Sequence, residues 1–409
     1  MTKSPTRYAV SIAALLASTA AFGDDVENLS DVFAKGDAGL DLRYRLEFVD
    51  QDGFTKKATA STLLSKIWYR TATINGFSGY IEGTNTTVVG KETYNNTVNG
   101  NITRPVVADP ETTELNQAYL QYAGSKGTAR IGRVGMNLDN QRFIGTVGFR
   151  QNDQTYDTAL LILNPTKDFS AIYSYVWNVN RIFGEDHPLG DLDTNTHTFN
   201  LSYNGFGFGK LTAYGYFIDL DDAPVFGLSS STVGARFAGK NAVSDNMKVG
   251  YEFEYAKQRD YKDNPADYSA DYWHAGINAS ASGFSLGVDY ELLGSDNGVS
   301  FKTPLATLHK FNGWADKFLG TPAAGLSDIF VTASYKVQSD GPLKGTLFKA
   351  VYHDFGSDVG DLDYGSEIDL LVSTKINKYV TASVKAAFYK ADSFATDTDK
   401  VWFTLAAKF

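Results

Sequence analysis

Residues 37–50 read DAGLDLRYRLEFVD, and apolar and charged side chains take turns along this stretch. One set of alternate positions is apolar: Leu40, Leu42, Tyr44, Leu46 and Phe48. The other set is charged: Asp41, Arg43, Arg45 and Glu47. Successive side chains of a β-strand point to opposite faces, so a period of two predicts a strand. The two faces of this strand must meet different surroundings.

The same alternation returns along the rest of the chain, for example in residues 248–257, 283–293, 366–376 and 399–409. Aromatic residues, which suit strands, are plentiful, with 24 Tyr and 27 Phe. The pattern predicts eighteen strands, at 37–49, 61–74, 76–89, 113–123, 127–136, 155–163, 168–180, 195–205, 209–220, 229–239, 246–258, 270–281, 284–293, 327–338, 344–355, 365–376, 379–391 and 400–409. Most reach the 9–11 residues that a tilted membrane strand needs.

The connections between these strands alternate in length. Short turns fall at 74–77, 124–127, 164–168, 204–209, 281–283 and 376–379, and longer polar stretches at 90–112, 137–154, 181–194, 259–269 and 294–326. Bacterial outer-membrane barrels have short periplasmic turns and long outer loops. The sequence therefore predicts an all-β, transmembrane antiparallel barrel of about eighteen strands. An even number of strands places both termini in the periplasm.

A soluble β-sandwich or β-helix would also alternate. A soluble sandwich, however, buries its apolar face against a second sheet. Eighteen long strands with alternating connections fit a closed barrel better, because closure removes the unpaired edges that lipid does not tolerate. The sequence has no run of about 18 apolar residues that would span a membrane as a helix.

The N-terminal residues have the features of a secretory signal. Lys3 and Arg7 precede an apolar stretch, and Ala21-Phe22-Gly23 offers a small-x-small cleavage site. We expect a signal peptide over 1–23 and a barrel over 24–409, in the bacterial outer membrane with lipid and lipopolysaccharide around it. Loss of Lys3 and Arg7 takes the formal charge from −10 to −12. An acidic chain lacks the basic footprint of a nucleic-acid-binding protein.

Charged residues on the inner face are the candidates for solute selection. The basic residues are Arg43, Arg45, Lys66, Arg70, Arg130, Arg133, Arg142 and Arg150, and Asp139, Asn140, Gln141, Gln151 and Asn152 lie among the last of them. Later strands carry the acidic residues Glu252, Glu254, Asp289, Glu291, Glu367 and Asp369. A basic wall opposite an acidic one would orient polar solutes in a transverse field. Paired charges that only stiffen the wall are the alternative.

Two local features need a structural explanation. Arg130 and Arg133 have opposite parity, so either a bulge at Gly132 turns both inward or one of them lies at the interface. Residues 137–154 form a nominal outer loop but contain Phe143 and several other apolar residues. We expect this loop to fold into the barrel and narrow the pore. An extracellular cap is the alternative.

Catalysis and metal binding have little support. The five histidines share no spacing that suggests a nucleophile and a base, so we expect no enzyme and no catalytic residue. The acidic run at 219–224 is more simply a solvated loop than a calcium site. The chain has no Cys, which excludes disulfides and thiolate metal sites. We expect neither a metal nor a cofactor.

Residues 130–157, RIGRVGMNLDNQRFIGTVGFRQNDQTYD, resemble the alginate-export family of outer-membrane barrels. LNQAYLQY at 115–122 and VYHDF at 351–355 are also similar. The resemblance implies a monomeric, eighteen-stranded barrel with an arginine-bearing constriction, through which the best-known members of the family pass an anionic polysaccharide. By position, it implies that Arg133, Asp139, Asn140, Gln141, Arg142, Arg150, Gln151 and Asn152 belong to this inner motif. The C-terminal VWFTLAAKF, ending in Phe409, resembles the signal that the barrel-assembly machinery recognises.

Three functions remain open at this stage. The first is a porin that passes small polar solutes, with anionic sugars or acids as candidates, through an arginine-lined constriction. The second is a polysaccharide exporter, although the known exporter carries a long periplasmic loop and every periplasmic turn here is short. The third is an adhesin or enzyme on the same scaffold, to which the long stretch 294–326 could contribute.

Overall fold

The computed structural model describes residues 25–409, so the expected signal peptide lies outside the described residues. Eighteen long strands form one sheet: β1 (Asp37–Gln51), β2 (Ala58–Arg70), β3 (Phe77–Val88), β4 (Thr112–Gly124), β5 (Gly127–Val134), β6 (Thr155–Leu163), β7 (Phe169–Asn180), β8 (Asp191–Phe206), β9 (Gly209–Ile218), β10 (Ser230–Ala242), β11 (Met247–Asp260), β12 (Ser269–Ala281), β13 (Phe284–Leu293), β16 (Leu326–Lys336), β17 (Leu347–Gly356), β18 (Asp363–Lys375), β19 (Val380–Ala391) and β20 (Thr398–Lys408). The predicted strands are confirmed, because each of them overlaps one of these strands.

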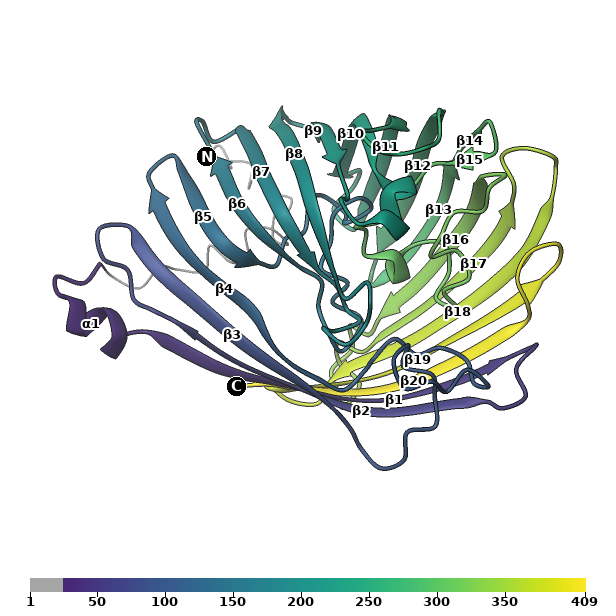
Figure 1. Ribbon diagram of the computed structural model, residues 1–409, viewed down its shortest axis with the longest axis horizontal. Coiled ribbons are helices and arrows are strands. Elements are labelled where there is room, and N and C mark those ends of the chain that lie inside the picture. Colours follow the sequence, from purple (N-terminus) through teal and green to yellow (C-terminus); the bar gives the residue numbers. More distant parts are fainter. Residues whose placement is uncertain (1–24) are drawn as a thin grey trace.

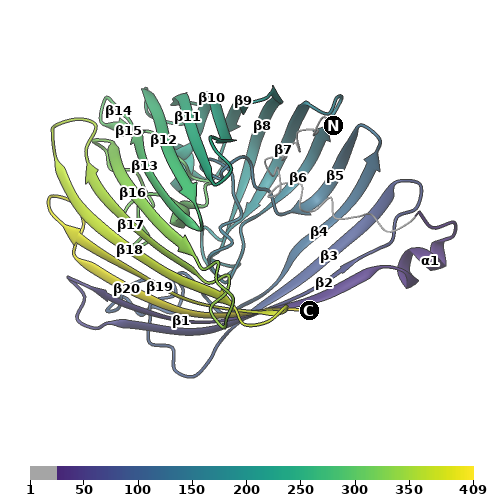
Figure 2. The same ribbon diagram turned by 180° about the vertical axis from the view of Figure 1, so that it is seen from behind.

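The sheet closes on itself. Each strand pairs antiparallel with its neighbour in the chain, and β1 pairs with β20 from Asp41↔Lys408 to Gln51↔Thr398. The strands follow one another around the wall in Figures 1 and 2, and the C-terminus lies beside β1. Closure leaves the sheet without an unpaired edge, which is the requirement for a sheet in lipid.

The outer face of the barrel is apolar and unburied. Its exposed side chains include Ile67, Ile81, Leu120, Ile131, Val233, Phe253, Ile277, Leu286, Ile329, Leu370 and Phe403. A soluble protein rarely exposes so much contiguous apolar surface to water, whereas in a membrane lipid tails cover such a surface. The alternate positions point inward and are largely polar, such as Glu47, Thr198 and Asp369.

Four smaller elements accompany the barrel in the described part of the chain. A short helix, α1 (Leu29–Ala34), precedes β1 and buries Val32. A two-stranded hairpin of β14 (Ser295–Asp296) and β15 (Val299–Ser300) follows β13, and the 3-10 helices η1 (Ala223–Leu228) and η2 (Leu308–Lys310) lie in connections. None of the helices in residues 25–409 is long and apolar enough to cross a membrane.

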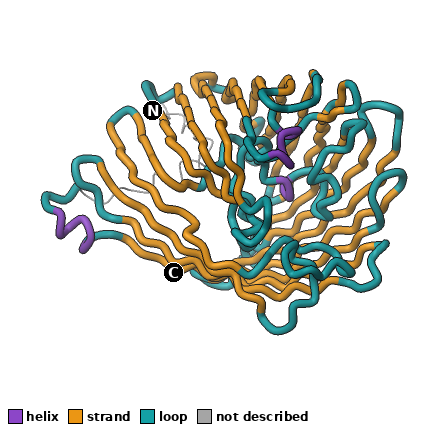
Figure 3. The backbone as a smooth tube through the Cα atoms, viewed as in Figure 1, coloured by secondary structure: helices purple, strands orange, loops and turns teal. Residues whose placement is uncertain are grey.

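The connections at the two ends of the barrel differ in length, as predicted. We call the end with the short connections and α1 the turn end, and the other the loop end. Figure 3 shows that several loop segments do not stay outside but run through the interior. The two longest of these segments determine the geometry of the lumen.

Candidate pore constriction

The first segment inside the barrel is the loop between β5 and β6, which contains residues 137–154; we call it the first inner loop. Phe143 anchors it far from its own strands. Its ring lies 5.3 Å from that of Tyr214 and 5.5 Å from that of Tyr272, on β9 and β12. The prediction that this loop folds into the barrel is confirmed, because Phe143 is buried against the wall at β9 and β12 and against Phe301.

The second segment lies between β13 and β16 and covers residues 294–325; we call it the second inner loop. It packs directly on the first. The Gly145 amide donates to the Leu305 carbonyl at 2.9 Å, and the Thr307 amide donates to the Gln141 carbonyl at 3.1 Å. The two loops therefore form one partition inside the lumen. The sequence allowed a role in adhesion for this segment. In the structure, most of its apolar side chains, such as Phe301 and Phe318, are buried.

Arg150 fastens the first inner loop to the wall and to the second inner loop. Its Nη1 lies 3.0 Å from Glu47 Oε2 on β1 and 3.6 Å from Asp109 Oδ2. Its Nη2 lies 3.2 Å from Asp316 Oδ2 in the second inner loop. Asp316 also accepts a bond from Lys400 Nζ on β20 at 2.7 Å. This buried network joins both loops to the β1–β20 seam.

Arg142 makes the corresponding attachment on the opposite side. Only 2% of this residue is exposed. Its Nε lies 2.8 Å from Glu291 Oε1 on β13, and its Nη2 donates to Asn312 Oδ1 at 3.0 Å. Asn312 in turn donates to Glu291 Oε2 at 2.7 Å. Arg142 and Arg150 are thus both paired with buried partners and hold the loops in place.

The neighbouring polar residues of the motif also serve the attachment. Gln151 is fully buried and donates its side chain to Thr62 Oγ1 at 2.8 Å, while it accepts from Arg43 Nε at 2.9 Å. Asn152 accepts from Thr86 Oγ1 and Thr112 Oγ1 at 2.9 and 2.7 Å. Amide side chains suit this task because they both donate and accept.

The remaining predicted residues lie along the lumen. Asn140 donates to Glu252, Asp139 lies 3.5 Å from Lys210, and Arg45 lies 4.0 Å from Asp109. The other inward contacts are Lys66 with Asp153, Glu252 with Arg236, Glu254 with Tyr214, and Asp289 with His274. Arg70 and Arg130 line a cavity described below. Nearly every candidate charge therefore has a partner of opposite sign or a polar neighbour.

Arg133 differs from the other candidates. The register runs without a break through Gly132 on both sides of β5, so the expected bulge does not form. Arg133 therefore shares the outward face with Ile131, which is 56% exposed, and pairs with Asp157 at 2.8 Å. The alternative, in which one of the two arginines lies at the interface, is the arrangement in the structure. Gly132 instead has a positive φ of 127°, and a Cβ at this position would lie 2.3 Å from the Ala118 carbonyl oxygen.

Three partners of the motif arginines were not foreseen. Asp109 and Asp316 are acids in loops, and Asn312 sits in a tight turn with a φ of 52°. Alternation cannot identify them because loops have no period. The apolar residues around Trp314 are the signal that could have shown that the stretch with Asn312 and Asp316 needs cover.

Burial determines the charge of His309 and Asp316, the two loop residues beside Arg150. Burial lowers the pKa of His309 well below its usual value, so the ring is neutral, and its Nδ1 lies 2.6 Å from Asp316 Oδ1. Burial alone would raise the pKa of the Asp316 carboxyl, but the hydrogen bond from His309 and the charges of Lys400 and Arg150 hold that pKa well below its usual range. Asp316 is thus a permanent anion at the junction of the two loops.

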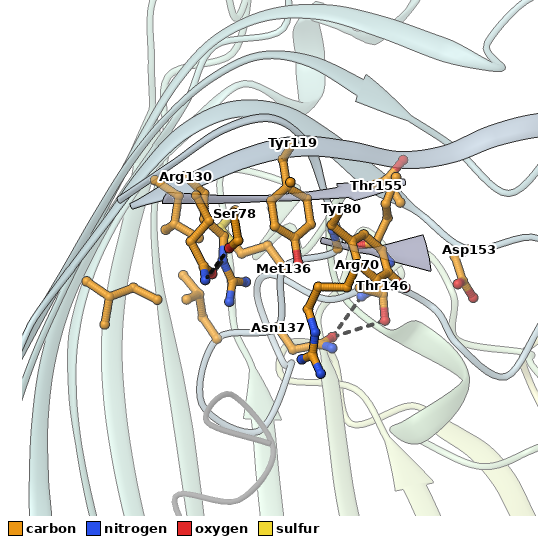
Figure 4. A pocket seen from close by; sticks show the side chains of 17 residues that line it. Arg70, Ser78, Tyr80, Tyr119, Arg130, Met136, Asn137, Thr146, Asp153 and Thr155 are labelled. Atoms are coloured by element: carbon orange, nitrogen blue, oxygen red, sulfur yellow. Dashed lines mark hydrogen bonds between the residues drawn. The ribbon is translucent and has the colours of Figure 1, made fainter. Parts of the chain in front are cut away.

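The space that the loops leave at the turn end is divided into two cavities. One, of about 340 Å³, is lined by Arg70, Arg130 and the descending part of the first inner loop (Figure 4). The other, of about 480 Å³, is lined by Asp139 and Asn140 of the same loop and by Lys210, Arg236 and Glu252. Within residues 25–409 no group of three His, Asp or Glu side chains is placed to hold a metal ion.

A closed antiparallel barrel of eighteen strands with an apolar outer face and loops folded into a polar lumen defines a class, the outer-membrane β-barrels. The sequence profile of the family described as alginate export matches residues 35–294, and the chain belongs to that family. No curated protein matches the chain significantly.

Solved structures with the same fold include proteins of two bacteria. OccAB2 of Acinetobacter baumannii superposes with a TM-score of 0.73 at 14% identity, over 93% of this chain and 99% of that one. OccK9 (OpdG) of Pseudomonas aeruginosa gives 0.74 at 13% identity, over 92% and 99%. The outer membrane protein opdK of P. aeruginosa gives 0.71 at 12% identity, over 91% and 98%. These likenesses confirm the barrel fold.

Proposed function

We propose that the protein is a passive outer-membrane channel for small polar solutes, with small organic anions favoured. The observation that carries the proposal is the partition made by the two inner loops. A barrel of this strand number without inserted loops would enclose a wide aqueous bore. The partition replaces that bore by cavities of about 340 and 480 Å³, which suit single small solutes.

The proposal gives the motif arginines a role different from direct selection. Arg142 and Arg150 are buried with carboxylates, so a passing solute does not meet their charge. They set the shape of the passage by fixing the loops. Selection then falls to lumen cations that line the cavities, such as Arg70, Arg130 and Lys210.

The orientation completes the proposal. The turn end faces the periplasm, as short turns do in bacterial barrels, and both termini lie there. Phe409 stacks on Tyr379 at 5.5 Å, and its amide donates to the Leu40 carbonyl at 2.9 Å. We propose that the barrel-assembly machinery engages this terminal strand before it pairs with β1, and that the finished barrel is a monomer surrounded by lipid and lipopolysaccharide.

Export of an anionic polysaccharide is the second candidate, and membership of the alginate export family favours it. A polymer needs one wide path, whereas the first inner loop crosses the lumen, with Leu138 lining one cavity and Asp139 lining the other. The short connections at the turn end also offer little surface for a periplasmic partner. We therefore place export second.

Conductance in planar lipid bilayers tests the proposal. Purified protein should give stable single-channel steps in KCl, and small organic anions should reduce the current in a concentration-dependent manner. Absence of steps from heat-modifiable, folded barrels would contradict a channel. Steps blocked only by an anionic polymer, and not by small anions, would favour export.

A further inference from the structure

The short helix α1 presents apolar side chains to its surroundings. Leu29 and Phe33 lie four positions apart, so they share one face of the helix, and they are 71% and 67% exposed. Val32 lies on the other side and packs with Val26 and Ala72. One exposed apolar side chain is common at a protein surface, but two large ones on the same face of a helix indicate an apolar environment.

The helix is bonded to the turn end of the barrel. The Ala72 amide donates to the Val32 carbonyl at 2.9 Å. The hydroxyl of Tyr69 on β2 donates to the Phe33 carbonyl. Figures 1 and 2 show α1 outside the barrel wall. These bonds hold the helix in one orientation, so the direction of its exposed face is set by the fold.

The exposed face of α1 borders a groove on the outer face of the wall. The groove, of about 620 Å³, lies between α1 and strands β2 to β5. Gly79 and Ala118 are small residues at outward positions and leave the space open. Large apolar or aromatic side chains form the sides of the groove: Phe33, Tyr69, Phe77, Ile81, Leu120 and Ile131. The groove therefore combines the helix with the lipid-facing surface of the barrel.

Continuity with that surface identifies the occupant. Lipid covers the outer face of a membrane barrel, and Ile81 and Leu120 of the groove are 51% and 67% exposed on this face. Ser78 and Tyr80 also border the groove, but they alternate with the outward positions, and the Tyr80 hydroxyl donates to Glu82 in the lumen. An apolar groove of this kind offers contacts to a hydrocarbon chain and few hydrogen bonds to a polar ligand.

The opposite face of α1 is charged. Asp31 and Lys35 form an ion pair at 2.9 Å, and the Lys35 side chain is 62% exposed. A helix with one apolar and one charged face lies in the interface between hydrocarbon and water. Tyr69 and Phe77 are aromatic residues at the turn end of the wall, which is the level of an interfacial aromatic girdle. Both features place α1 at the membrane surface.

We infer that α1 is an interfacial anchor and that the groove between α1 and β2 to β5 holds an acyl chain of a phospholipid. Leu29 and Phe33 enter the leaflet at the turn end, which is the periplasmic leaflet in the proposed orientation. The anchor fixes the depth of this end of the barrel, whose other connections are short turns. The inference goes beyond the proposed channel function, because neither conduction nor a solute enters it.

Depth-dependent fluorescence quenching tests the anchor. The chain has no Cys, so one introduced Cys can carry a polarity-sensitive fluorophore in the folded full chain in phosphatidylcholine vesicles. For Leu29→Cys and Phe33→Cys we expect blue-shifted emission, quenching by lipids with a nitroxide near the headgroup, and protection from aqueous iodide. Ile67→Cys, on the outer wall with the same 67% exposure as Phe33, is the membrane control. Ser339→Cys, exposed between β16 and β17 at the turn end, is the water control.

Retained phospholipid tests the groove. The folded protein is transferred from vesicles to a detergent without phosphorus, and the phosphate that stays with the chain is measured. Gly79→Leu should lose retained phospholipid because leucine fills the groove, while its Cβ would lie 3.7 Å from Thr71 Cγ2, an ordinary contact that permits folding. Phe33→Ser should also lose phospholipid because it removes one side of the groove. Ala213→Leu, at a small outward position of β9, is the matched control and should retain as much as the unmodified chain.

Each other outcome overturns the inference. Labels at positions 29 and 33 that iodide quenches as strongly as the label at 339 would place the helix in water. Labels shielded from both iodide and lipid nitroxides would assign the face to a protein partner or a second copy of the chain. Equal phospholipid retention by Gly79→Leu and the unmodified chain would show that the groove holds no lipid. These assays measure no current, so their failure refutes only this inference, and absence of conductance refutes only the channel.

Discussion

Replacement of Arg150 by alanine tests whether the motif arginines are attachments or selectivity charges. The side chain lies among Glu47, Asp109 and Asp316, at 3.0, 3.6 and 3.2 Å, and all four groups are at most 8% exposed. Its removal leaves three buried carboxylates with too few cations. Loss of one partner of a buried ion pair costs about 3–5 kcal/mol, and Lys400 offsets part of that cost at Asp316.

We therefore expect Arg150→Ala to lower the stability of the folded barrel by about 3 kcal/mol or more. It should also release the first inner loop, which would make the single-channel current larger and noisier. The assays are urea unfolding in lipid vesicles, followed by tryptophan fluorescence, and single-channel recording. Arg150→Lys should be intermediate, since a lysine cannot bridge three carboxylates with one planar group.

Arg133→Ala is the matched control. Arg133 also pairs with an aspartate, but on the outward face and with 28% of its side chain exposed. An exposed pair contributes about 0–1 kcal/mol, and its loss should leave the current unchanged. The reasoning is refuted if Arg150→Ala unfolds like the control and changes only the ratio of anion to cation permeability.

Three further predictions follow from the same contacts. Acidification should weaken the loops from about pH 6.5 downward. Burial lowers the pKa of His309, so on acidification the unfolded chain binds a proton at this residue that the folded chain does not bind. The urea midpoint of His309→Gln should therefore fall less steeply with decreasing pH than that of the unmodified protein. Phe143→Ala should cost about 3–5 kcal/mol and enlarge the current, because the ring contacts aromatic side chains of β9 and β12; an unchanged current would place the loop elsewhere. Gly132→Val should reduce the yield of heat-modifiable barrel, since a Cβ there would lie 2.3 Å from the Ala118 carbonyl oxygen at a φ of 127°, and normal yield would refute the close approach.

The strands could be predicted because the alternation of side chains encodes directly which face meets lipid. In β1, for example, Tyr44 and Phe48 are exposed while Arg45 and Glu47 are buried in the lumen. The number of strands and the closure followed from the same pattern and from the alternating connection lengths. The entry of the first inner loop could be predicted for a related reason, because its apolar residues required cover.

The partners inside the lumen could not be predicted. The contact of Arg150 with Asp316 joins residues 166 positions apart, and both lie in loops without a period. The alternation also could not determine which face of β5 Arg133 occupies, because a bulge and a regular strand predict opposite faces from the same sequence. The cavity lined by Arg70, Tyr119 and Arg130 combines three strands, and Leu160 and Ile162 join its lining only when β6 is placed beside them.

The central claim is that two loops folded into the barrel determine the size of the passage. The most direct test is the single-channel conductance of a variant in which residues 139–152 are replaced by a short Gly-Ser linker, in preparations shown to be folded by heat modifiability. The account predicts a conductance well above that of the full chain, because the partition loses half of its structure. An unchanged conductance would mean that the constriction lies elsewhere and would contradict the account.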